Sequence, residues 1–290
     1  MNILTFDLEE WFHILNNPST DNEPSWGNFE YRLRKNIDRI LSLLDDSNNI
    51  ATFFCLGWVA RKYPHIITEI DSLGHEIGSH SNSHQLIYRY DRDFFKKDLE
   101  ISIDSLENIT GKKVKAYRAP GFSMVRGTLW AFEELILQGI EFDCSIFLGN
   151  HAHGGRIKAF GHKPLIINFE GKKIKEFPIN TFRVGLKEIA FAGGGYFRFL
   201  PYQLIKRLMY RNDYIMTYFH PRDFDGDQPI IPDLTNYRKF KSYYGLNGAF
   251  SKAEKFVNDF DFVSLNHADK LVNWNEAAQF ELLDEKLHLS

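Results

Sequence analysis

The sequence predicts an α/β protein with a barrel-like parallel sheet, and two observations lead to that prediction. Segments with the composition of buried strands alternate with amphipathic helices along most of the 290 residues, as in repeated βα units with right-handed crossovers. Polar residues able to do chemistry follow several of these strands, at the end where such folds place their active sites. We therefore expect one domain over residues 1–290, an irregular (β/α) barrel.

Short apolar runs supply the expected strands of this barrel. Each run is a few residues long and bounded by polar residues, Gly or Pro, which favours a strand over a helix. The predicted strands are residues 2–7, 51–57, 75–79, 114–118, 140–143, 174–179, 214–220 and 261–265. The last of them lies in residues 224–290, which we expect to complete the barrel.

Apolar residues at intervals of three and four predict the helices between these strands. The predicted helices are residues 28–46, a segment through 66–73, and residues 92–109, 127–138, 201–212 and 250–259. Gly74 and Gly139 are placed to end two of them, and Pro201 to begin another. Residues 144–173 and 221–249 have no such pattern, so we expect irregular structure there.

Composition excludes several classes of protein. With 35 basic and 38 acidic residues and no basic block, the chain is not expected to bind nucleic acid. Cys55 and Cys144 lie in apolar runs, which predicts buried free thiols in a reducing compartment. The N-terminus has no basic leader and no apolar run is long enough to cross a membrane, so we expect a cytoplasmic protein without a transmembrane segment.

Two clusters of polar residues have the composition of a divalent-metal hydrolase site. Asp7, Glu9 and Glu10 follow the first strand, and His80 and His84 lie four residues apart after the third. On an extended chain residues 7 and 9 point the same way and residue 10 the other. Asp7 and Glu9 are thus the expected pair, one as metal ligand and one as base. The alternatives are helix-capping carboxylates and surface histidines in a polar loop.

Arg118 and His220 end two further strands. An arginine that points into a site can hold a carboxylate in place and ionised, and a histidine at a strand end can protonate a leaving group. The alternatives are a surface arginine before a Pro-Gly turn and a histidine that only stabilises its loop.

In this order, these residues resemble the motifs of the polysaccharide deacetylase family, also called the NodB-homology or carbohydrate esterase 4 group. The similar segments are Thr5-Phe6-Asp7, His80-Ser81-Asn82-Ser83-His84, Arg118-Ala119-Pro120, Phe142-Asp143-Cys144-Ser145 and Tyr218-Phe219-His220. They lie within residues 1–223. The stretches ATFFCLGWVA, GHEIGSHSNSHQLIY and AGGGYFRFLPY resemble the branch associated with exopolysaccharide gene clusters.

The resemblance implies a NodB-like fold and a role for each motif residue. Glu9, His80 and His84 would bind a divalent metal, with zinc as the expected ion. Asp7 would be the base, held by Arg118, and His220 the acid, with Asp143 orienting it. A backbone N–H just after Pro120 would stabilise the oxyanion. The residues expected to contact substrate are Trp11, Pro120, Gly121, Phe122 and Tyr196.

Two positions depart from the family pattern. Leu8 stands where the family has a second aspartate that binds the metal, so that role passes to Glu9 or, less favourably, to Glu10. The fourth motif lacks its tryptophan, and Trp11, Phe122 or Phe147 would have to supply the apolar wall of an acetyl pocket.

We therefore expect a metal-dependent hydrolase that removes acetyl from an N-acetylated sugar of a polysaccharide or its precursor, with a saccharide as its partner. One alternative is a C–N hydrolase of a small cyclic ureide, with the long loops closed over a small pocket. A second is an inactive carbohydrate-binding protein, which Leu8 favours and the acid–base residues disfavour.

Overall fold

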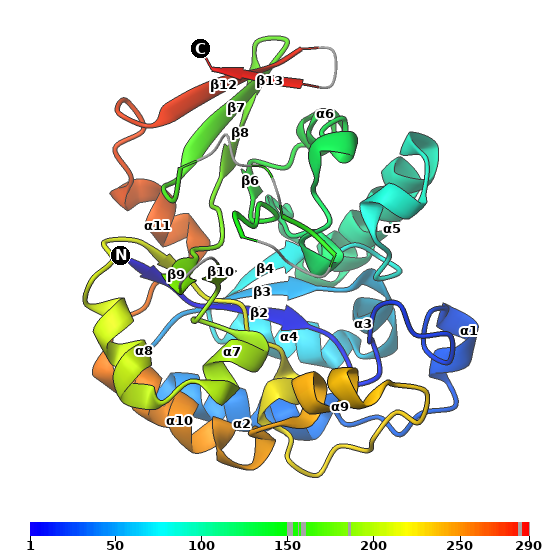
Figure 1. Ribbon diagram of the computed structural model, residues 1–290. Helices are drawn as coiled ribbons and strands as arrows, with labels where there is room; N and C mark the ends of the chain where they lie inside the picture. Colours follow the sequence, from blue (N-terminus) through cyan, green and yellow to red (C-terminus); the bar gives the residue numbers. More distant parts are fainter. Residues whose placement is uncertain (150–152, 156, 158–160, 185–186, 284–285, 290) are drawn as a thin grey trace.

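The computed structural model describes residues 1–149, 153–155, 157, 161–184, 187–283 and 286–289. Neighbouring parallel strands form one wall of its barrel (Figure 1). In order across the sheet they are β2 (Thr5–Leu8), β3 (Thr52–Cys55), β4 (Glu76–Ser79), β5 (Ala116–Tyr117) and β6 (Phe142–Asp143). Each of them overlaps a strand predicted from the sequence. Their carboxyl ends therefore meet at one rim, as the sequence predicts.

The first strand of the chain also pairs with the strand predicted over residues 214–220. β1 (Asn2–Ile3) is parallel to β11 (Ile215–Met216), and a parallel bridge joins Phe6 to Phe219. The N–H of Asp7 donates to the carbonyl of Phe219 at 2.8 Å. This contact brings the chain before His220 beside the chain that carries Asp7 and Glu9.

The side chain of Asn180 closes the barrel at a point where regular strand pairing is interrupted. Beyond β6, an isolated parallel bridge joins Phe147 to Ile179. The next residue, Asn180, donates from Nδ2 to the carbonyl of Tyr214 at 2.8 Å and accepts the N–H of Met216 at 2.8 Å. The barrel is thus irregular, as predicted, because an amide side chain replaces strand pairing at this point.

The barrel wall separates two apolar clusters, because alternate residues of a strand point to opposite faces. Phe53 packs in the outer cluster and stacks on Phe6 with ring centroids 5.1 Å apart. Its neighbour Phe54 belongs to the inner cluster. Asp7 is the register partner of Phe54, so its carboxylate also faces the interior.

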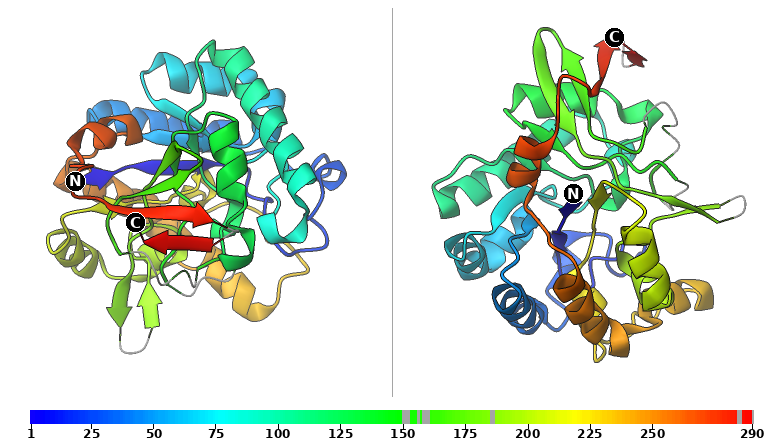
Figure 2. Two further views of the ribbon diagram at one scale, coloured as in Figure 1. Left: turned by 90° about the horizontal axis from the view of Figure 1, so that it is seen from above. Right: turned by 90° about the vertical axis from the view of Figure 1, so that its left-hand side faces the viewer.

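Helices cover the outside of the barrel (Figure 2). They are α2 (Leu33–Asp46), α3 (Gly57–Lys62), α4 (Pro64–Ser72), α5 (Arg92–Thr110), α6 (Ala131–Leu137), α8 (Tyr202–Met209) and α10 (Leu246–Asp259). Local chemistry sets their ends: α5 begins where Asp91 accepts the N–H of Phe94 and ends at Gly111, whose φ is 67°. All of the predicted helices are present, and α3 is an additional one.

The expectation of a long loop over residues 221–249 is wrong. This segment holds a 3-10 turn (Pro221–Phe224), helix α9 (Asn236–Tyr243) and the start of α10. None of the residues of α9 is buried, and its aromatic residues Tyr237 and Phe240 are exposed, so this helix lacks the buried apolar stripe that marks the predicted ones. The remaining helices are α1 (Glu23–Trp26), α7 (Gly194–Phe199) and α11 (Leu265–Leu271), with 3-10 turns at Ile87–Arg89, Pro120–Phe122 and Arg126–Thr128.

Two hairpins extend the sheet beyond β6, which corrects two further expectations. β7 (Leu165–Phe169) and β8 (Lys172–Glu176) lie partly in the segment expected to be irregular, and β12 (Ala278–Leu283) and β13 (Lys286–Leu289) follow α11. The sheet runs β6–β8–β7–β12–β13, so the C-terminal strands β12 and β13 extend the sheet and do not complete the barrel. The predicted strand over residues 261–265 joins the ring through an isolated bridge from Val263 to Ile3 and through the N–H of Leu265, which donates to Oγ1 of Thr52 at 2.9 Å. A smaller hairpin pairs β9 (Phe182–Val184) with β10 (Lys187–Ile189).

The cysteine prediction is confirmed, since Cys55 and Cys144 are both buried and unpaired. Within the described residues, none of the helices combines the length and apolarity needed to cross a membrane.

Asn180→Ala tests the closure of the ring. The substitution leaves the carbonyl of Tyr214 and the N–H of Met216 without their partner, so we expect the free energy of unfolding to fall by about 2 to 4 kcal/mol. Urea denaturation followed by circular dichroism measures this. The control is Asn258→Ala on the exposed side of α10, where a single bond to the Glu254 carbonyl is lost and the change should stay within about 0.5 kcal/mol. Equal losses in both variants would contradict the closure.

Candidate metal and catalytic site

The strand ends bring six predicted site residues together at one rim of the barrel. Asp7 is in β2 and Glu9 follows that strand directly, His80 follows β4, and Arg118 follows β5. His84 and His220 join them from adjoining loops. Nearly all are buried, with 2% of Asp7, 5% of Glu9, 2% of His80 and 6% of His84 exposed, so their charges interact in a region with little water.

An ion pair between Arg118 and Asp7 occupies the centre of this group. Arg118 is fully buried, and its Nη1 lies 2.7 Å from Oδ1 of Asp7. The same guanidinium donates to Oγ1 of Thr5 at 2.8 Å and to the carbonyl of Cys144 at 3.3 Å, and its Cζ lies 4.2 Å from the centre of the Phe54 ring. The aspartate is thereby fixed in position and paired with a permanent positive charge.

Glu9, His80 and His84 each direct one possible ligand atom toward the others, and these atoms all lie within 4.8 Å of one another. Oε2 of Glu9 lies 2.7 Å from Nε2 of His84. This buried contact does not have the geometry of a hydrogen bond. One carboxylate and two imidazoles are a common donor set for a divalent metal. A carboxylate oxygen that meets an imidazole nitrogen closely without a well-aligned hydrogen bond fits two ligands that face a shared metal position.

The surroundings of His80 and Glu9 favour metal binding. Nδ1 of His80 lies 2.8 Å from the carbonyl of Arg118, a bond that leaves Nε2 facing the cluster. Burial lowers the pKa of His80 to about 4, so the ring is neutral and able to ligate near pH 7. Burial alone would raise the pKa of Glu9, but the contact with His84 and the nearby charge of His220 outweigh burial and lower the pKa of that carboxylate.

Glu10 binds the start of α2 and, unlike Glu9, is not part of the proposed ligand set. Its side chain accepts the N–H groups of Arg32 and Leu33 at 3.0 Å, where α2 begins, and the hydroxyl of Tyr63 at 3.1 Å. These bonds satisfy helix-terminal donors that have no partner within the helix. The alternation predicted for residues 7–10 is present, and it places Glu9 at the cluster.

The loop that carries the two histidines is held by a buried aspartate, and its backbone is strained. Asp98 of α5 accepts the N–H of Asn82 at 2.8 Å and that of Ser83 at 3.1 Å. Ser81 and His84 have φ angles of 69° and 54°, which non-glycine residues rarely adopt. Strain of this kind persists only where the surroundings enforce it, and it is frequent at functional sites.

His220 faces the cluster from the opposite side. Its Nε2 lies 3.7 Å from Oδ2 of Asp7 and 3.8 Å from Oε1 of Glu9, while Nδ1 lies 3.1 Å from Oδ2 of Asp223. Burial lowers the pKa of His220, but the hydrogen bond to Asp223 and the charges of Glu9 and Asp7 outweigh it and raise the pKa to about 9. The imidazole is therefore protonated near pH 7.

Comparison with known proteins relates the chain to a family. Residues 18–140 match the family described as polysaccharide deacetylase, and residues 144–270 match a domain of unknown function (DUF3473). The chain is 33% identical over 97 residues to a peptidoglycan-N-acetylglucosamine deacetylase of Bacillus cereus, which covers 33% of this chain and 35% of that protein. The match of residues 18–140 and this relative support the polysaccharide deacetylase family for this chain. The expected resemblance is thereby confirmed.

Other members of this family extend the comparison. A second peptidoglycan-N-acetylglucosamine deacetylase of Bacillus cereus is 28% identical over 85 residues, 29% of this chain and 31% of that protein. The chain thus matches about a third of the length of these curated relatives. A solved structure from Mycobacterium smegmatis, which its description assigns to the polysaccharide deacetylases, has a TM-score of 0.64 at 18% identity and covers 95% of this chain and 90% of that one. This likeness confirms the NodB-like fold.

The structure does not bring Asp143 to His220, and the partner of that histidine is Asp223. Asp143 lies on β6, where its two oxygens accept from Oγ and N of Ser145 at 2.6 and 3.1 Å. Its register partner on β8 is Glu176, and both carboxyl groups are fully buried. Burial raises the pKa of both groups. The expectation that Asp143 orients His220 came from the family resemblance, and the structure gives His220 a different carboxylate.

The residues expected to contact substrate lie in different surroundings. Trp11 packs in the aromatic core against Phe29, and its indole N–H donates to the Glu30 carbonyl at 2.8 Å, which are the contacts of a core residue. Pro120 and Gly121 form a 3-10 turn beside Arg118.

Phe122 and its neighbours form an apolar wall next to the buried ion pair. The Phe122 ring centre lies 5.8 Å from Cζ of Arg118, 5.3 Å from the ring of Tyr218 and 5.4 Å from that of Phe147. Of the three aromatic residues considered for the acetyl wall, Phe122 and Phe147 thus lie together and Trp11 does not. Phe122 has a φ of 54°, a further strained residue at this rim.

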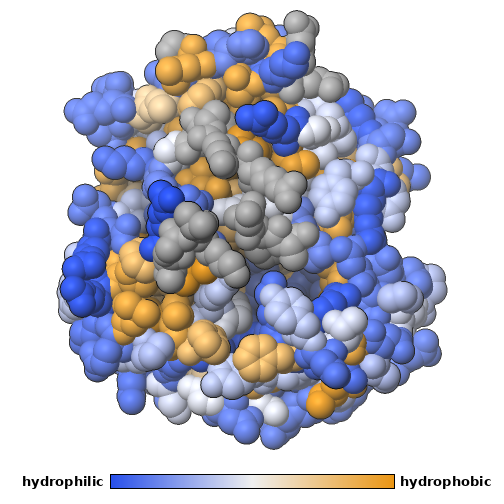
Figure 3. All heavy atoms as spheres, in the orientation of Figure 1, coloured by the Kyte–Doolittle hydropathy of each residue, from blue (hydrophilic) through white to orange (hydrophobic). Residues whose placement is uncertain are grey.

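Tyr196 is on α7, where 38% of it is exposed. In the orientation of Figure 1, apolar side chains gather on the side of α7 and α8 (Figure 3). Phe199 and Leu204 are among the exposed large apolar residues of these helices. Tyr196 therefore stands at a partly apolar surface, and its contact with substrate stays a prediction.

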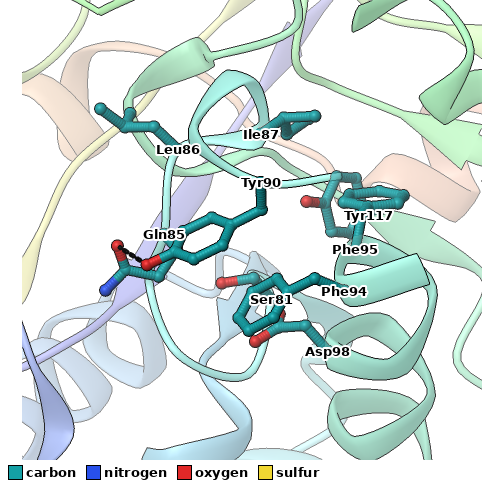
Figure 4. Close-up of a pocket in the computed structure, with 9 residues that line it drawn as sticks. All are labelled: Ser81, Gln85, Leu86, Ile87, Tyr90, Phe94, Phe95, Asp98 and Tyr117. Atoms are coloured by element: carbon teal, nitrogen blue, oxygen red, sulfur yellow. Dashed lines mark hydrogen bonds between the residues drawn. The ribbon is translucent and has the colours of Figure 1, made fainter. Parts of the chain in front are cut away.

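A separate small pocket lies behind the histidine loop (Figure 4). Its lining residues are Ser81, Gln85, Leu86, Ile87, Tyr90, Phe94, Phe95, Asp98 and Tyr117. The hydroxyl of Tyr90 donates to Oε1 of Gln85 at 3.3 Å, and the Tyr90 ring stacks on Phe94. None of the three proposed ligands lines this pocket.

Sequence reasoning missed three charged residues of the site. Asp223 follows His220 by three residues in a turn that Pro221 begins, and this capping spacing was a usable signal. Arg198 and Glu176 had no local signal, since the fold alone brings them to Asp223 and Asp143. Within the segment expected to be irregular, residues 221–249, Asp223 and Asp225 are buried.

Zinc titration distinguishes Glu9 from Glu10. Glu9→Gln should weaken zinc binding by more than the roughly 10- to 100-fold that loss of an outer partner causes, because it removes a ligand charge. Glu10→Gln should lower stability through its lost helix cap but leave zinc affinity within about threefold. Isothermal titration of chelator-treated protein with zinc chloride measures both. Loss of zinc only in Glu10→Gln would contradict the assignment.

The carboxyl pair predicts a pH dependence of stability. Because the pKa of Glu176 is raised in the folded state, the unfolded chain loses this proton first, above about pH 4.3, and the free energy of unfolding then falls as pH rises. Glu176→Gln removes this contribution, so its stability should decline less steeply between about pH 5 and 8, by at most roughly 1.4 kcal/mol per pH unit. Denaturation at several pH values tests this, and parallel curves for the two proteins would refute it.

Proposed function

We propose that this protein is a metal-dependent hydrolase that removes the acetyl group from an N-acetylated sugar of a polysaccharide or its precursor. One observation carries the proposal: Nε2 of His220 lies 3.8 Å from Glu9 of a Glu-His-His donor set and 3.7 Å from the carboxylate of Asp7. The match to the polysaccharide deacetylase family supports it, as do relatives named as peptidoglycan-N-acetylglucosamine deacetylases.

Glu9, His80 and His84 are the residues that would hold the metal, and zinc suits this donor set. The buried Oε2 of Glu9, which lies 2.7 Å from Nε2 of His84 without the geometry of a hydrogen bond, supports this assignment. A divalent cation bound there would act as a Lewis acid toward the acetyl carbonyl and the attacking water. Leu8 thus does not argue for an inactive protein, since Glu9 supplies the carboxylate that Leu8 lacks.

The chain's own residues perform the proton transfers. Asp7 accepts a proton from the attacking water, and Arg118 keeps its carboxylate in one orientation throughout. The N–H of Gly121, just after Pro120, is the proposed donor to the oxyanion. His220 presents Nε2 toward the same space and protonates the sugar nitrogen as the C–N bond breaks. Acetate and a free amine are the products.

Acetate release from N-acetylglucosamine oligomers tests this function directly. Asp7→Asn should keep zinc but lower kcat by about 10²- to 10⁴-fold, because it removes the base. The matched control is Asp21→Asn, at an exposed aspartate paired with Arg89, which should leave kcat unchanged. An enzymatic acetate assay with zinc content measured on the same samples gives both readouts.

Two results would overturn the proposal. Full activity in Asp7→Asn would exclude its role as base. A zinc-loaded wild-type protein that releases no acetate from any oligomer of the panel would exclude the substrate class, and cyclic ureides would be assayed next.

A further inference from the structure

The side of His220 turned away from the metal cluster makes two contacts with one carboxylate. Oδ2 of Asp223 accepts the backbone N–H of His220 at 3.0 Å and lies 3.1 Å from its Nδ1. A carboxylate can only accept, so Nδ1 must carry the proton of this second bond. The ring is thereby fixed with Nε2 toward Asp7 and Glu9.

Asp223 is held by a buried arginine. Its other oxygen, Oδ1, lies 3.3 Å from Nε of Arg198, and the two side chains are only 6% and 5% exposed. The pairing compensates the charge of a carboxylate that the protein removes from water.

Arg198 is fixed in turn by backbone carbonyls at the end of α9. Its Nη1 donates to Ser242 at 3.0 Å and to Tyr244 at 2.8 Å, and its Nη2 donates to Lys241 at 3.1 Å. A guanidinium bound through both terminal nitrogens has little freedom to turn. The orientation of His220 is thus linked, through Asp223 and Arg198, to the position of α9.

Asp143, the residue that the family pattern suggests for this task, is engaged elsewhere. Ser145 donates to both of its oxygens, and its register partner in the sheet is Glu176. Asp223 is not occupied in this way. Among the described residues, the polar contacts of its side chain are with His220 and Arg198.

We propose that Asp223, fixed by Arg198, is the positioning residue that holds His220 ready to deliver a proton to the leaving amine. This inference rests on the proposed deacetylase function. As the C–N bond breaks, its electron pair goes to nitrogen, which takes the proton from Nε2 of His220. The proton that Asp7 took from water balances this transfer, and His220 keeps its Nδ1 proton on Asp223 throughout.

The need for this proton depends on the leaving group, which provides the test. An amine is a poor leaving group unless it is protonated, whereas the 4-nitrophenolate of 4-nitrophenyl acetate departs as an anion. Loss of His220 positioning should therefore impair amide hydrolysis and spare aryl-ester hydrolysis. A merely structural role for Asp223 would impair both reactions equally.

The experiment compares kcat and KM of the zinc-loaded protein on an N-acetylglucosamine oligomer and on 4-nitrophenyl acetate. Asp223→Asn should lower kcat on the oligomer by about 10²- to 10³-fold with KM within about threefold, and change ester hydrolysis by less than about threefold. The matched control is Asp225→Asn, two residues later in the same segment, whose carboxylate binds Arg32 and Asn36 instead. It should not change the ratio of the two activities.

Further variants keep the proposal falsifiable if Asp223→Asn fails to fold. Arg198→Lys should lower the amide-to-ester ratio in the same direction by a smaller factor. In wild-type protein the Nδ1 proton of His220 should give a low-field proton NMR signal that His220→Gln abolishes and Asp143→Asn leaves in place.

The outcomes separate this inference from the function on which it rests. A wild-type protein active on the oligomer, with an Asp223→Asn variant that keeps its amide activity or loses both activities equally, overturns the inference alone. A selective amide loss in Asp143→Asn and not in Asp223→Asn assigns the task to Asp143. A wild-type protein that releases acetate from no oligomer overturns the proposed function and the inference with it.

Discussion

The guanidinium of Arg118 has no exposed surface, so protein groups must accept its hydrogen bonds. Several of these acceptors surround it at the centre of the barrel. Asp7 and Thr5 supply them from β2, and the carbonyl of Cys144 from the end of β6. Removing the partner of a buried ion costs about 3 to 5 kcal/mol, so this pairing opposes any shift of β2 against β5. The carbonyl of Arg118 also binds Nδ1 of His80, and one residue thus orients both the proposed base and a proposed ligand.

The site draws on three stretches of chain that the family matches treat separately. The polysaccharide deacetylase match spans His80, His84 and Arg118, the chain before it supplies Asp7 and Glu9, and the match of unknown function supplies His220. The bridge between Phe6 and Phe219 joins the first and last of these stretches directly. In this chain, the segment matched as a domain of unknown function thus contributes Asp223 and Arg198, and with them the support of the proposed acid.

The strand ends and their polar residues were predictable because strand order and side-chain alternation are properties of local sequence. Alternation favoured Glu9 over Glu10, and the helix cap formed by Glu10 explains why both carboxylates are present. The partner of His220 was not predicted, because the family resemblance pointed to Asp143, and the capping spacing of Asp223 after His220 was the one local signal for the correct aspartate. The hairpin of β7 and β8 was missed because its turn, Glu170-Gly171, lacks the Asn-Gly or Asp-Gly signal, although both residues have positive φ. Helix α9 was missed because it buries none of its residues.

The central claim is that Glu9, His80 and His84 together form a metal site facing Asp7 and His220. Crystals of the zinc-loaded protein, with diffraction data collected on both sides of the zinc absorption edge, test it most directly. We predict an anomalous peak bounded by Oε2 of Glu9 and the imidazoles of His80 and His84, which Glu9→Gln weakens or abolishes. A fully occupied zinc peak elsewhere, with none between these three side chains, would contradict the account.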